Sequence, residues 1–398
     1  MTAFGRSRRA GSALLMLALS LPAIAAVHRE QRVVRDDQGW VQESSGPLSD
    51  EKLLEVTRVV GAVRVTTGAK AGTYLLRLHS QERLEKDARQ QFSTFHLGVG
   101  RTRGAEIIQT VGPIDMALRA ELILQIPAKT DSVHVDTMAG KITISGKVAH
   151  LDLQTHGGDI ELDDADTLRA VTMGGSVIVN HRLGNSFIRT DGGDIKVDAS
   201  VGDLEIASLG GNIWLKAIAS GRVQSGGGNI EVVRCLGPLL VRTAGGNISL
   251  GEMGGAVTAE SGGGSIRVGV AHGPVTASTA LGNIDLWKLS QGATAHTGMG
   301  KITAEFISDR ASMHTSELVT SMGDIVVYFA GAVPGNVHAV TGRSPTRRVV
   351  CEFPELKISN GLIKYGARSI VAEGAIHGGG PEIDLRTMVG QIELRNAH

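Results

Sequence analysis

Residues 239–250 read LLVRTAGGNISL, residues 257–268 read VTAESGGGSIRV, and residues 275–286 read VTASTALGNIDL. The same unit recurs about every 18 residues between residues 133 and 325. A fixed period of this size is the signature of a solenoid, in which each repeat stacks on the next. The repeat therefore indicates the fold class before any single residue is considered.

Each unit aligns on the isoleucine or valine that follows its glycines, and we call this residue the anchor. Apolar residues recur two positions after the anchor and seven positions before it, and a serine or threonine recurs five positions before it. A spacing of two is typical of strands and not of helices. Each unit thus predicts two short strands joined by a glycine corner. The anchors are Ile142, Ile160, Val177, Ile195, Ile213, Ile230, Ile248, Ile266, Ile284, Ile302 and Ile325.

The glycine two positions before each anchor is expected to let the chain turn with φ > 0, because glycine has no Cβ. The Asn or Asp that follows it in many units suits the same kind of turn. Stacking the units about 4.8 Å apart would bury a continuous apolar column that no single unit can bury alone. A coil of this length would also fit three hexapeptides of a left-handed helix, but the anchors do not recur every six residues.

The pattern therefore predicts an all-β fold, a right-handed parallel β-helix or solenoid with coils of about 18 residues. The longer interval between Ile302 and Ile325 indicates a small insertion near residues 308–312. The residues expected to build the repeat are Gly158, Ile160, Gly193, Ile195, Gly211, Ile213, Gly246, Ile248, Gly264, Ile266, Gly282 and Ile284.

The hydroxyl column five positions before the anchors is the one regular polar feature, with Thr243 and Thr279 as examples. One interpretation is a repetitive ligand-binding face. The column shares its parity with the apolar positions beside it, however, so we expect these hydroxyls to point inward near a corner and to satisfy the backbone.

Fainter copies of the repeat lie outside the regular array. The segment from Leu54 to Val65 matches the template with Arg58 at the hydroxyl position, and the segment from Ile383 to Leu394 matches it fully. Caps are expected at both ends, because an open strand edge would pair with other chains. The expected organisation begins with a signal peptide at 1–25 and a polar, loosely ordered segment at 26–52. N-terminal strands and a cap follow at 53–132, with a helical insertion at 80–95 and a strand at 118–127. Regular repeats are expected at 133–330, and a loop excursion at 331–355 is followed by C-terminal capping coils to 398.

The start of the chain predicts export. Arg6, Arg8 and Arg9 precede an apolar run at 13–21, and a small-residue motif ends at Ala25. This order is that of a secretory signal peptide. The run is too short to span a bilayer comfortably, which argues against a membrane anchor. We expect a periplasmic or extracellular, cell-surface protein with no transmembrane segment after cleavage, and both the general and the twin-arginine export routes stay open.

Composition argues against a nucleic-acid partner. The chain has 40 basic and 40 acidic residues, so its formal net charge is zero, and aromatic residues make up 3%. A nucleic-acid surface needs an excess of positive charge, and a stacking platform needs aromatic side chains.

One acidic cluster could support chemistry. Asp159, Glu161, Asp163, Asp164 and Asp166 fall within a single coil. The first four are weak candidates for calcium ligands, and the patch from Asp159 to Asp166 could serve a glycan-active lyase or hydrolase. Strand alternation sends some of these side chains to opposite faces, so we favour a solvated edge, with no catalytic residue, cofactor or metal.

The chain has two cysteines, Cys235 and Cys351. An exported protein could join them in a disulfide. Cys235 occupies a position where other coils have Met253 and Leu289, which favours a small core residue instead.

Two further stretches carry a family resemblance. Residues 126–146 read IPAKTDSVHVDTMAGKITISG and residues 377–394 read HGGGPEIDLRTMVGQIEL. Together with the GG-[DN]-I-x-L repeats, they resemble the bacterial "putative adhesin" family, exported β-strand-repeat proteins catalogued as a domain of unknown function. The resemblance covers residues 50–395 and brings no catalytic residues to this chain.

The sequence thus favours a non-enzymatic, exported scaffold or adhesin-like protein. Its expected partners are cell-envelope or surface proteins and glycans, bound through long flat faces, and it could also self-associate end to end or face to face. The alternative is the glycan-active enzyme built on the patch from Asp159 to Asp166.

Overall fold

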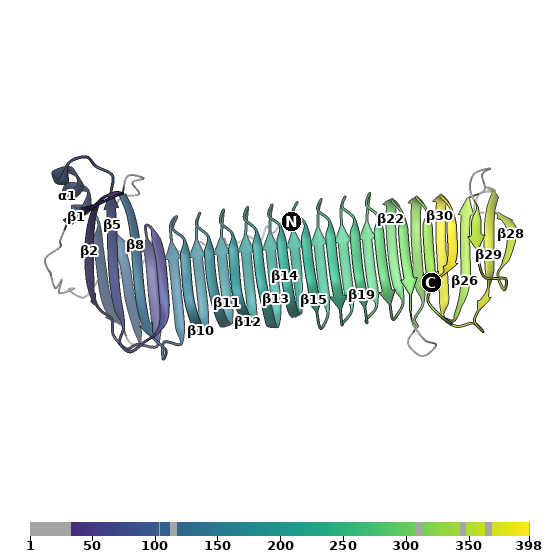
Figure 1. The fold of residues 1–398 in the computed structure, drawn as a ribbon, viewed down its shortest axis with the longest axis horizontal. Helices are drawn as coiled ribbons and strands as arrows, with labels where there is room; N and C mark the ends of the chain where they lie inside the picture. Colours follow the sequence, from purple (N-terminus) through teal and green to yellow (C-terminus); the bar gives the residue numbers. More distant parts are fainter. Residues whose placement is uncertain are drawn as a thin grey trace, which may run out of the picture.

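The computed structural model describes residues 33–102, 104–111, 118–307, 313–342, 348–362 and 368–397. In this part the chain is almost entirely strand, with one short helix, and it forms a long rod (Figure 1). The expected signal peptide at 1–25 and the expected insertion at 308–312 lie outside the described residues.

The regular array winds through parallel strands, two for each coil. In the first coils one long strand supplies the second half of one coil and the first half of the next, whereas from β15 onward the two halves are separate strands. The strands of the array are β9 (Ser132–Thr137), β10 (Ile142–Thr155), β11 (Ile160–Thr172), β12 (Val177–Thr190), β13 (Ile195–Ser208), β14 (Ile213–Ser225), β15 (Ile230–Cys235), β16 (Leu239–Thr243), β17 (Ile248–Met253), β18 (Val257–Ser261), β19 (Ile266–Ala271), β20 (Val275–Thr279), β21 (Ile284–Leu289), β22 (Ala293–Met299), β23 (Ile302–Phe306), β24 (Ser316–Met322) and β25 (Ile325–Phe329).

The anchors stack in one interior column, as the sequence predicts. Ile213 pairs in register with Ile230, and Ile230 pairs with Ile248. Both strands of each coil turn their alternate apolar residues into one continuous core, where the anchors are almost fully buried. The β-solenoid is therefore confirmed, with two-stranded coils, and the handedness of the winding stays a prediction.

The hydroxyl column points inward, as its parity predicts. The Thr243 hydroxyl donates to the carbonyl oxygen of Gly228 in the preceding coil (3.0 Å) and accepts from the Gly246 amide of its own corner (3.1 Å). The same pair of bonds recurs at Thr279, with Gly264 and Gly282 as partners. Each hydroxyl satisfies backbone groups that the corner leaves without a strand partner. The column is structural, and it is not a ligand-binding face.

The glycine two positions before each anchor has a different cause from the one expected. In the array only Gly323 has a positive φ at this position, so φ > 0 is the wrong explanation for the others. A Cβ built on Gly246 would lie 2.1 Å from the Gly228 carbonyl oxygen, and one on Gly264 would lie 2.0 Å from that of Gly246. Glycine is required because successive corners approach too closely for any side chain.

At the N-terminal end the first coil lies inside its own cap. β3 pairs with β9 of the array on one side and with β7 on the other, while β4 lies between β10 and β8. Antiparallel pairings of β5, β2 and β1, and of β6 with β7, then close this end. The elements are β1 (Val33–Asp36), β2 (Gly39–Pro47), β3 (Leu53–Val59), β4 (Ala62–Ala69), β5 (Thr73–Ser80), α1 (Glu85–Ser93), β6 (His96–Thr102), β7 (Ala105–Val111) and β8 (Leu118–Pro127).

Two expectations for this end are confirmed and one is wrong. The helix predicted within 80–95 is α1, which buries Ala88 and Phe92 and carries an ion pair between Glu85 and Arg89 (2.7 Å). The strand predicted at 118–127 is β8. The segment at 26–52 is not loosely ordered over residues 33–47, because β1 and β2 extend the sheet of β5, whose edge would otherwise be open.

At the C-terminal end the terminal coil likewise lies between the array and a cap. β24 and β25 pair with β30 and β31, and these pair in turn with β26 and β27. The loop excursion expected at 331–355 is therefore wrong for the residues of β26 and β27. These two strands pair with β30 and β31, the two strands of the last coil. The elements are β26 (Gly335–Gly342), β27 (Val349–Cys351), β28 (Lys357–Leu362), β29 (Arg368–Ile376), β30 (Glu382–Val389) and β31 (Ile392–Asn396), with β26, β29 and β28 antiparallel.

Adjacent glycines test the close approach of the corners. Gly246→Ala should lower the free energy of unfolding by about 3 kcal/mol or more, because its methyl group meets a backbone carbonyl that cannot rotate away. Gly245→Ala should change it by less than about 1 kcal/mol, since no atom lies within 4 Å of a Cβ there. Denaturant unfolding of the two variants measures the difference, and equal stabilities would contradict the explanation.

A second matched pair lies within β20. Thr279→Val should destabilise the protein by about 1–3 kcal/mol, because it leaves the Gly264 carbonyl and the Gly282 amide without their hydroxyl partner. Thr276→Val, on the exposed face of the same strand, should be close to neutral. Thermal unfolding compares them, and a neutral Thr279→Val would show that the hydroxyl column contributes nothing.

Candidate functional site

Charged side chains on the outer faces bind their neighbours in adjacent coils. Arg242 and Glu260 are separated by 2.9 Å, and Arg234 and Glu252 by 3.2 Å. The paired residues occupy equivalent positions in adjacent coils, so these ion pairs link each coil to the next along the rod. Each exposed pair contributes little to stability, about 0–1 kcal/mol. In these ion pairs each charge is bound to a neighbour in the adjacent coil, so it does not point toward a shared site.

The acidic cluster does not form a site. Its five carboxylates contact separate groups in the coils on either side, and no two of them contact the same group. The contacts are Asp159 with the Ser176 amide (2.8 Å), Glu161 with Lys141 Nζ (2.6 Å) and Asn180 Nδ2 (3.4 Å), Asp163 with the Gly146 amide (2.9 Å), Asp164 with the Arg182 amide (3.0 Å) and His181 Nδ1 (3.5 Å), and Asp166 with Lys147 Nζ (2.9 Å).

The pKa shifts in this cluster run against glycosidase chemistry. The hydrogen bond from Lys141 lowers the pKa of Glu161, and the hydrogen bond from Lys147 lowers that of Asp166. A general acid for glycoside cleavage needs a raised pKa, so that it holds a proton at neutral pH. Glu161 and Asp166 are kept ionised instead, which fits a solvated edge and not a general acid.

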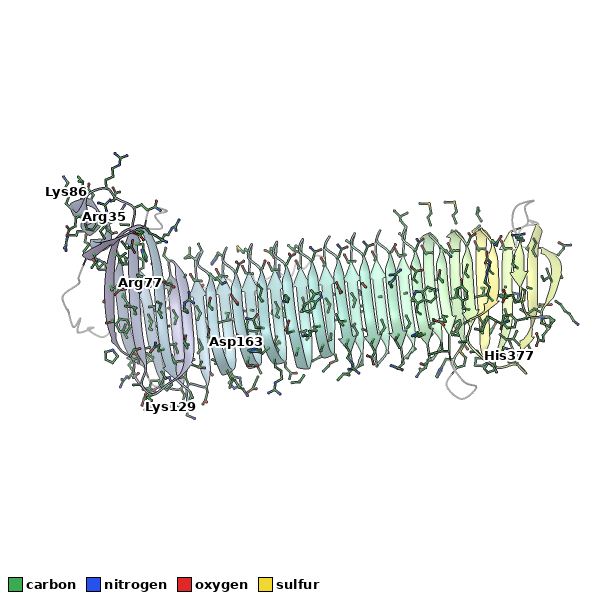
Figure 2. The ribbon with its side chains drawn as sticks, viewed as in Figure 1. Arg35, Arg77, Lys86, Lys129, Asp163 and His377 are labelled. Atoms are coloured by element: carbon green, nitrogen blue, oxygen red, sulfur yellow. The ribbon has the colours of Figure 1, made fainter. Side chains whose placement is uncertain are left out.

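No group of three or more His, Cys, Asp or Glu side chains could hold a metal ion in the described part of the chain. The weak calcium candidates Asp159, Glu161, Asp163 and Asp164 therefore do not converge. Figure 2 shows Asp163 on the rod far from His377, which lies toward the C-terminal end.

Both cysteines are free thiols, so they form no disulfide with one another. Cys235 stacks in register between Ile218 and Met253 in the core, as its position in the repeat predicts. Burial raises the pKa of both thiols, which keeps them protonated and weakly reactive at neutral pH.

Aromatic side chains on the outer face contact one another. Trp287 and Tyr328 stack with their ring centroids 6.1 Å apart, and Lys196 lies 5.3 Å from the ring centroid of Trp214. These rings are only partly exposed, and their contacts reduce the ring surface that a ligand could reach.

A feature that sequence reasoning missed lies on the glycine edge, the line of corners along the rod. Three positions before the anchor most coils have glycine, but the last four have Leu281, Met299, Met322 and Val389, which we call the edge ridge. These side chains are between 43% and 55% exposed. Met299 pairs with Met322, and Met322 pairs with Val389, so the ridge is continuous over its last three side chains. In the sequence, this ridge is visible as the replacement of the first corner glycine by an apolar residue in the last four coils.

A shallow groove of about 820 Å³ lies beside this edge. Small residues four positions before the anchor form its floor, namely Ala244, Gly262 and Ala280. The side chains of Arg242 and Glu260, already paired with each other, contribute to its lining. The hydroxyls of Thr243 and Thr279 in its lining are already bonded to backbone groups of the corners.

Comparison with known proteins gives no family assignment. No family model matches the chain, and no curated protein matches it.

Some solved structures are loosely similar to this chain. A "putative lipid binding protein" from Parabacteroides distasonis is 13% identical, with 72% of this chain and 96% of that chain covered and a TM-score of 0.29. A "putative adhesin" from Parabacteroides merdae is 11% identical, with 72% and 95% covered and a TM-score of 0.28. Another from Bacteroides fragilis is 11% identical, with 90% and 97% covered and a TM-score of 0.20. These names are consistent with the family resemblance in the sequence, and TM-scores this low support no inference about what the chain binds.

Glu106 is a buried carboxyl in the N-terminal cap. It accepts hydrogen bonds from the hydroxyl and the amide of Ser49, and Arg101 lies 3.9 Å away. Burial nevertheless raises its pKa. Because the folded state holds this proton more tightly than the unfolded chain, ionisation of Glu106 lowers stability as pH rises through its folded pKa.

Glu106→Gln should therefore raise the unfolding temperature relative to the native protein at pH 7, and the gain should shrink as pH falls toward about 4, where a free Glu protonates. Glu205→Gln on the exposed face of β13 is the control, with no gain expected at either pH. Thermal unfolding across this range measures both variants. A gain for Glu106→Gln that grows at low pH would contradict the assignment.

Proposed function

We propose that this protein is an exported, non-enzymatic scaffold that binds cell-envelope or surface partners along its outer faces. The observation that carries the proposal is the pairing of outer charges from coil to coil, as in Arg242 with Glu260 and Arg234 with Glu252. Such faces are long, rigid and regular, and their polar groups do not converge on a reacting atom. Surfaces of this kind suit extended contact with a macromolecule.

Export rests on the sequence, with the basic start at Arg6, Arg8 and Arg9 and the cleavage motif that ends at Ala25. In the described residues no helix is both long enough and apolar enough to cross a bilayer. The periplasm and the cell surface are the compartments that fit this role.

Purified residues 26–398 should bind isolated cell envelopes saturably and should not cleave polysaccharides. The measurements are a binding isotherm on washed envelopes and a product assay on a panel of acidic and neutral polysaccharides, with and without calcium. Pretreating the envelopes with protease or with periodate separates a protein partner from a glycan partner. Cell fractionation with N-terminal sequencing checks export, and the mature chain should begin near Ala26.

Asp159→Ala distinguishes the scaffold from the glycan-active alternative. The substitution removes one hydrogen bond to the Ser176 amide at an exposed corner, so envelope binding should be unchanged. Turnover of any polysaccharide that this variant abolishes would overturn the proposal. Binding that does not saturate would overturn it as well.

A further inference from the structure

The edge ridge is not required by the fold. Three positions before the anchor, a Cβ on Gly174, Gly245 or Gly263 would meet no atom within 4 Å. The corner therefore accepts any side chain there, and packing does not dictate the residue. Four successive coils nonetheless place an apolar side chain at this position and expose it. Contiguous exposed apolar surface of this kind marks an interaction site.

A second apolar set lies on the same edge toward the N-terminal end. Four positions before the anchor, alternate coils carry Met138, Met173 and Leu209, all exposed. Leu209 protrudes most, at 61% exposure. In the next coils the same position is Gly226, Ala244 and Gly262, and the last two belong to the floor of the groove. The edge thus carries exposed apolar side chains toward both ends of the rod. Between them lies a segment of small residues that includes the floor of the groove.

We propose that the glycine edge is a self-association surface, through which two copies pair antiparallel about a two-fold axis between the coils of Ile230 and Ile248. This axis places Leu209 of one copy over Gly262 of the other, so that an exposed leucine enters the groove. It also brings Met173 toward Met299.

The same axis brings Met138 toward Val389 at the ends of the contact. Each match occurs twice, because a two-fold interface is self-complementary and closed. The small residues at the centre let the two backbones approach closely, while the methionines adapt to one another at the periphery. Pairing through this edge does not depend on the proposed envelope-binding function.

The size of the edge suits a second copy. Twelve coils about 4.8 Å apart and two sheets about 10 Å apart give a strip on the order of 600 Å² per copy. Two such strips bury on the order of 1,200 Å² in total, which is the lower limit for a specific protein interface. We therefore expect a reversible dimer with a Kd on the order of micromolar.

The charges along the edge do not favour an anionic bilayer as the occupant. One position before the anchors, Lys141 and Lys301 are offset by Asp159, Asp194 and Asp324. Peripheral membrane contact by a short apolar ridge needs an excess of basic residues to attract the surface. A second copy has no such requirement, although the axis also brings Asp159 toward Asp324, a like-charge contact that salt screens at an exposed edge.

Sedimentation velocity of residues 26–398 at about 1–100 µM, which brackets the expected Kd, tests the proposal. The native protein should shift from monomer to dimer over this range. Leu209→Asp should weaken association at least tenfold, because it places a charge in the apolar contact. Val201→Asp is the matched control, since Val201 is 62% exposed on β13 and lies away from the glycine edge, and it should dimerise like the native protein. Unfolding temperatures of both variants verify that they are folded.

Disulfide cross-linking tests the arrangement in a Cys351→Ser background. A mixture of Gly174→Cys and Met299→Cys proteins should form a mixed disulfide, whereas Gly174→Cys alone should not cross-link to itself. Self-cross-linking of Gly174→Cys would establish a parallel pairing and overturn the proposed axis. A native protein that stays monomeric throughout, or that instead floats with anionic vesicles in a Leu209-dependent manner, would overturn self-association itself.

Discussion

The close approach of successive glycine corners is the constraint on which the rest of this structure depends. Where one coil passes over the next, the carbonyl oxygen of one glycine occupies the space that a Cβ would need on the following one, as at Gly228 and Gly246. The hydroxyl of Thr243 bridges the same two glycines. Sterics and hydrogen bonding therefore fix the same register in each coil, and the apolar columns align because the corners do.

The same stacking creates the problem that the two caps solve. A parallel array ends in rows of unpaired amides and carbonyls, which would bind another chain. At the N-terminal end the chain forms the terminal coil after β1 and β2, then the remaining cap strands beyond it, and then enters the array. At the C-terminal end it leaves the array at β25, builds the cap strands, and returns to form the terminal coil between them and the array. The terminal coils, built from β3 with β4 and from β30 with β31, thus lie inside the stack and not at its ends. In each cap the outer pairings are antiparallel, so the parallel stack ends there without a large extra domain.

Regular stacking also explains why the outer faces carry so little chemistry. Equivalent residues lie side by side along the rod, so a carboxylate tends to meet the side chain or the amide of the next coil, as Glu161 meets Lys141. In the Asp159–Asp166 cluster the five carboxylates are held by separate partners, so they do not meet at one reacting centre. The positions that remain free to vary lie on the edges, where the corners exclude Cβ atoms at one position and accept any side chain at the next.

The sequence by itself determined the period, the strand pairs, the inward hydroxyls and the interior column of anchors, because each depends on neighbours one coil away and the repeat states that spacing directly. It also placed α1 and β8, whose local patterns are strong. Only the tertiary structure decided the position of the terminal coils, since strand order at the ends depends on pairing between segments far apart in the chain. The cause of the glycine column, the partners of the Asp159–Asp166 cluster and the edge ridge were likewise tertiary. Sequence parity shows which way a side chain points, and only the distance between neighbouring coils shows what it meets there.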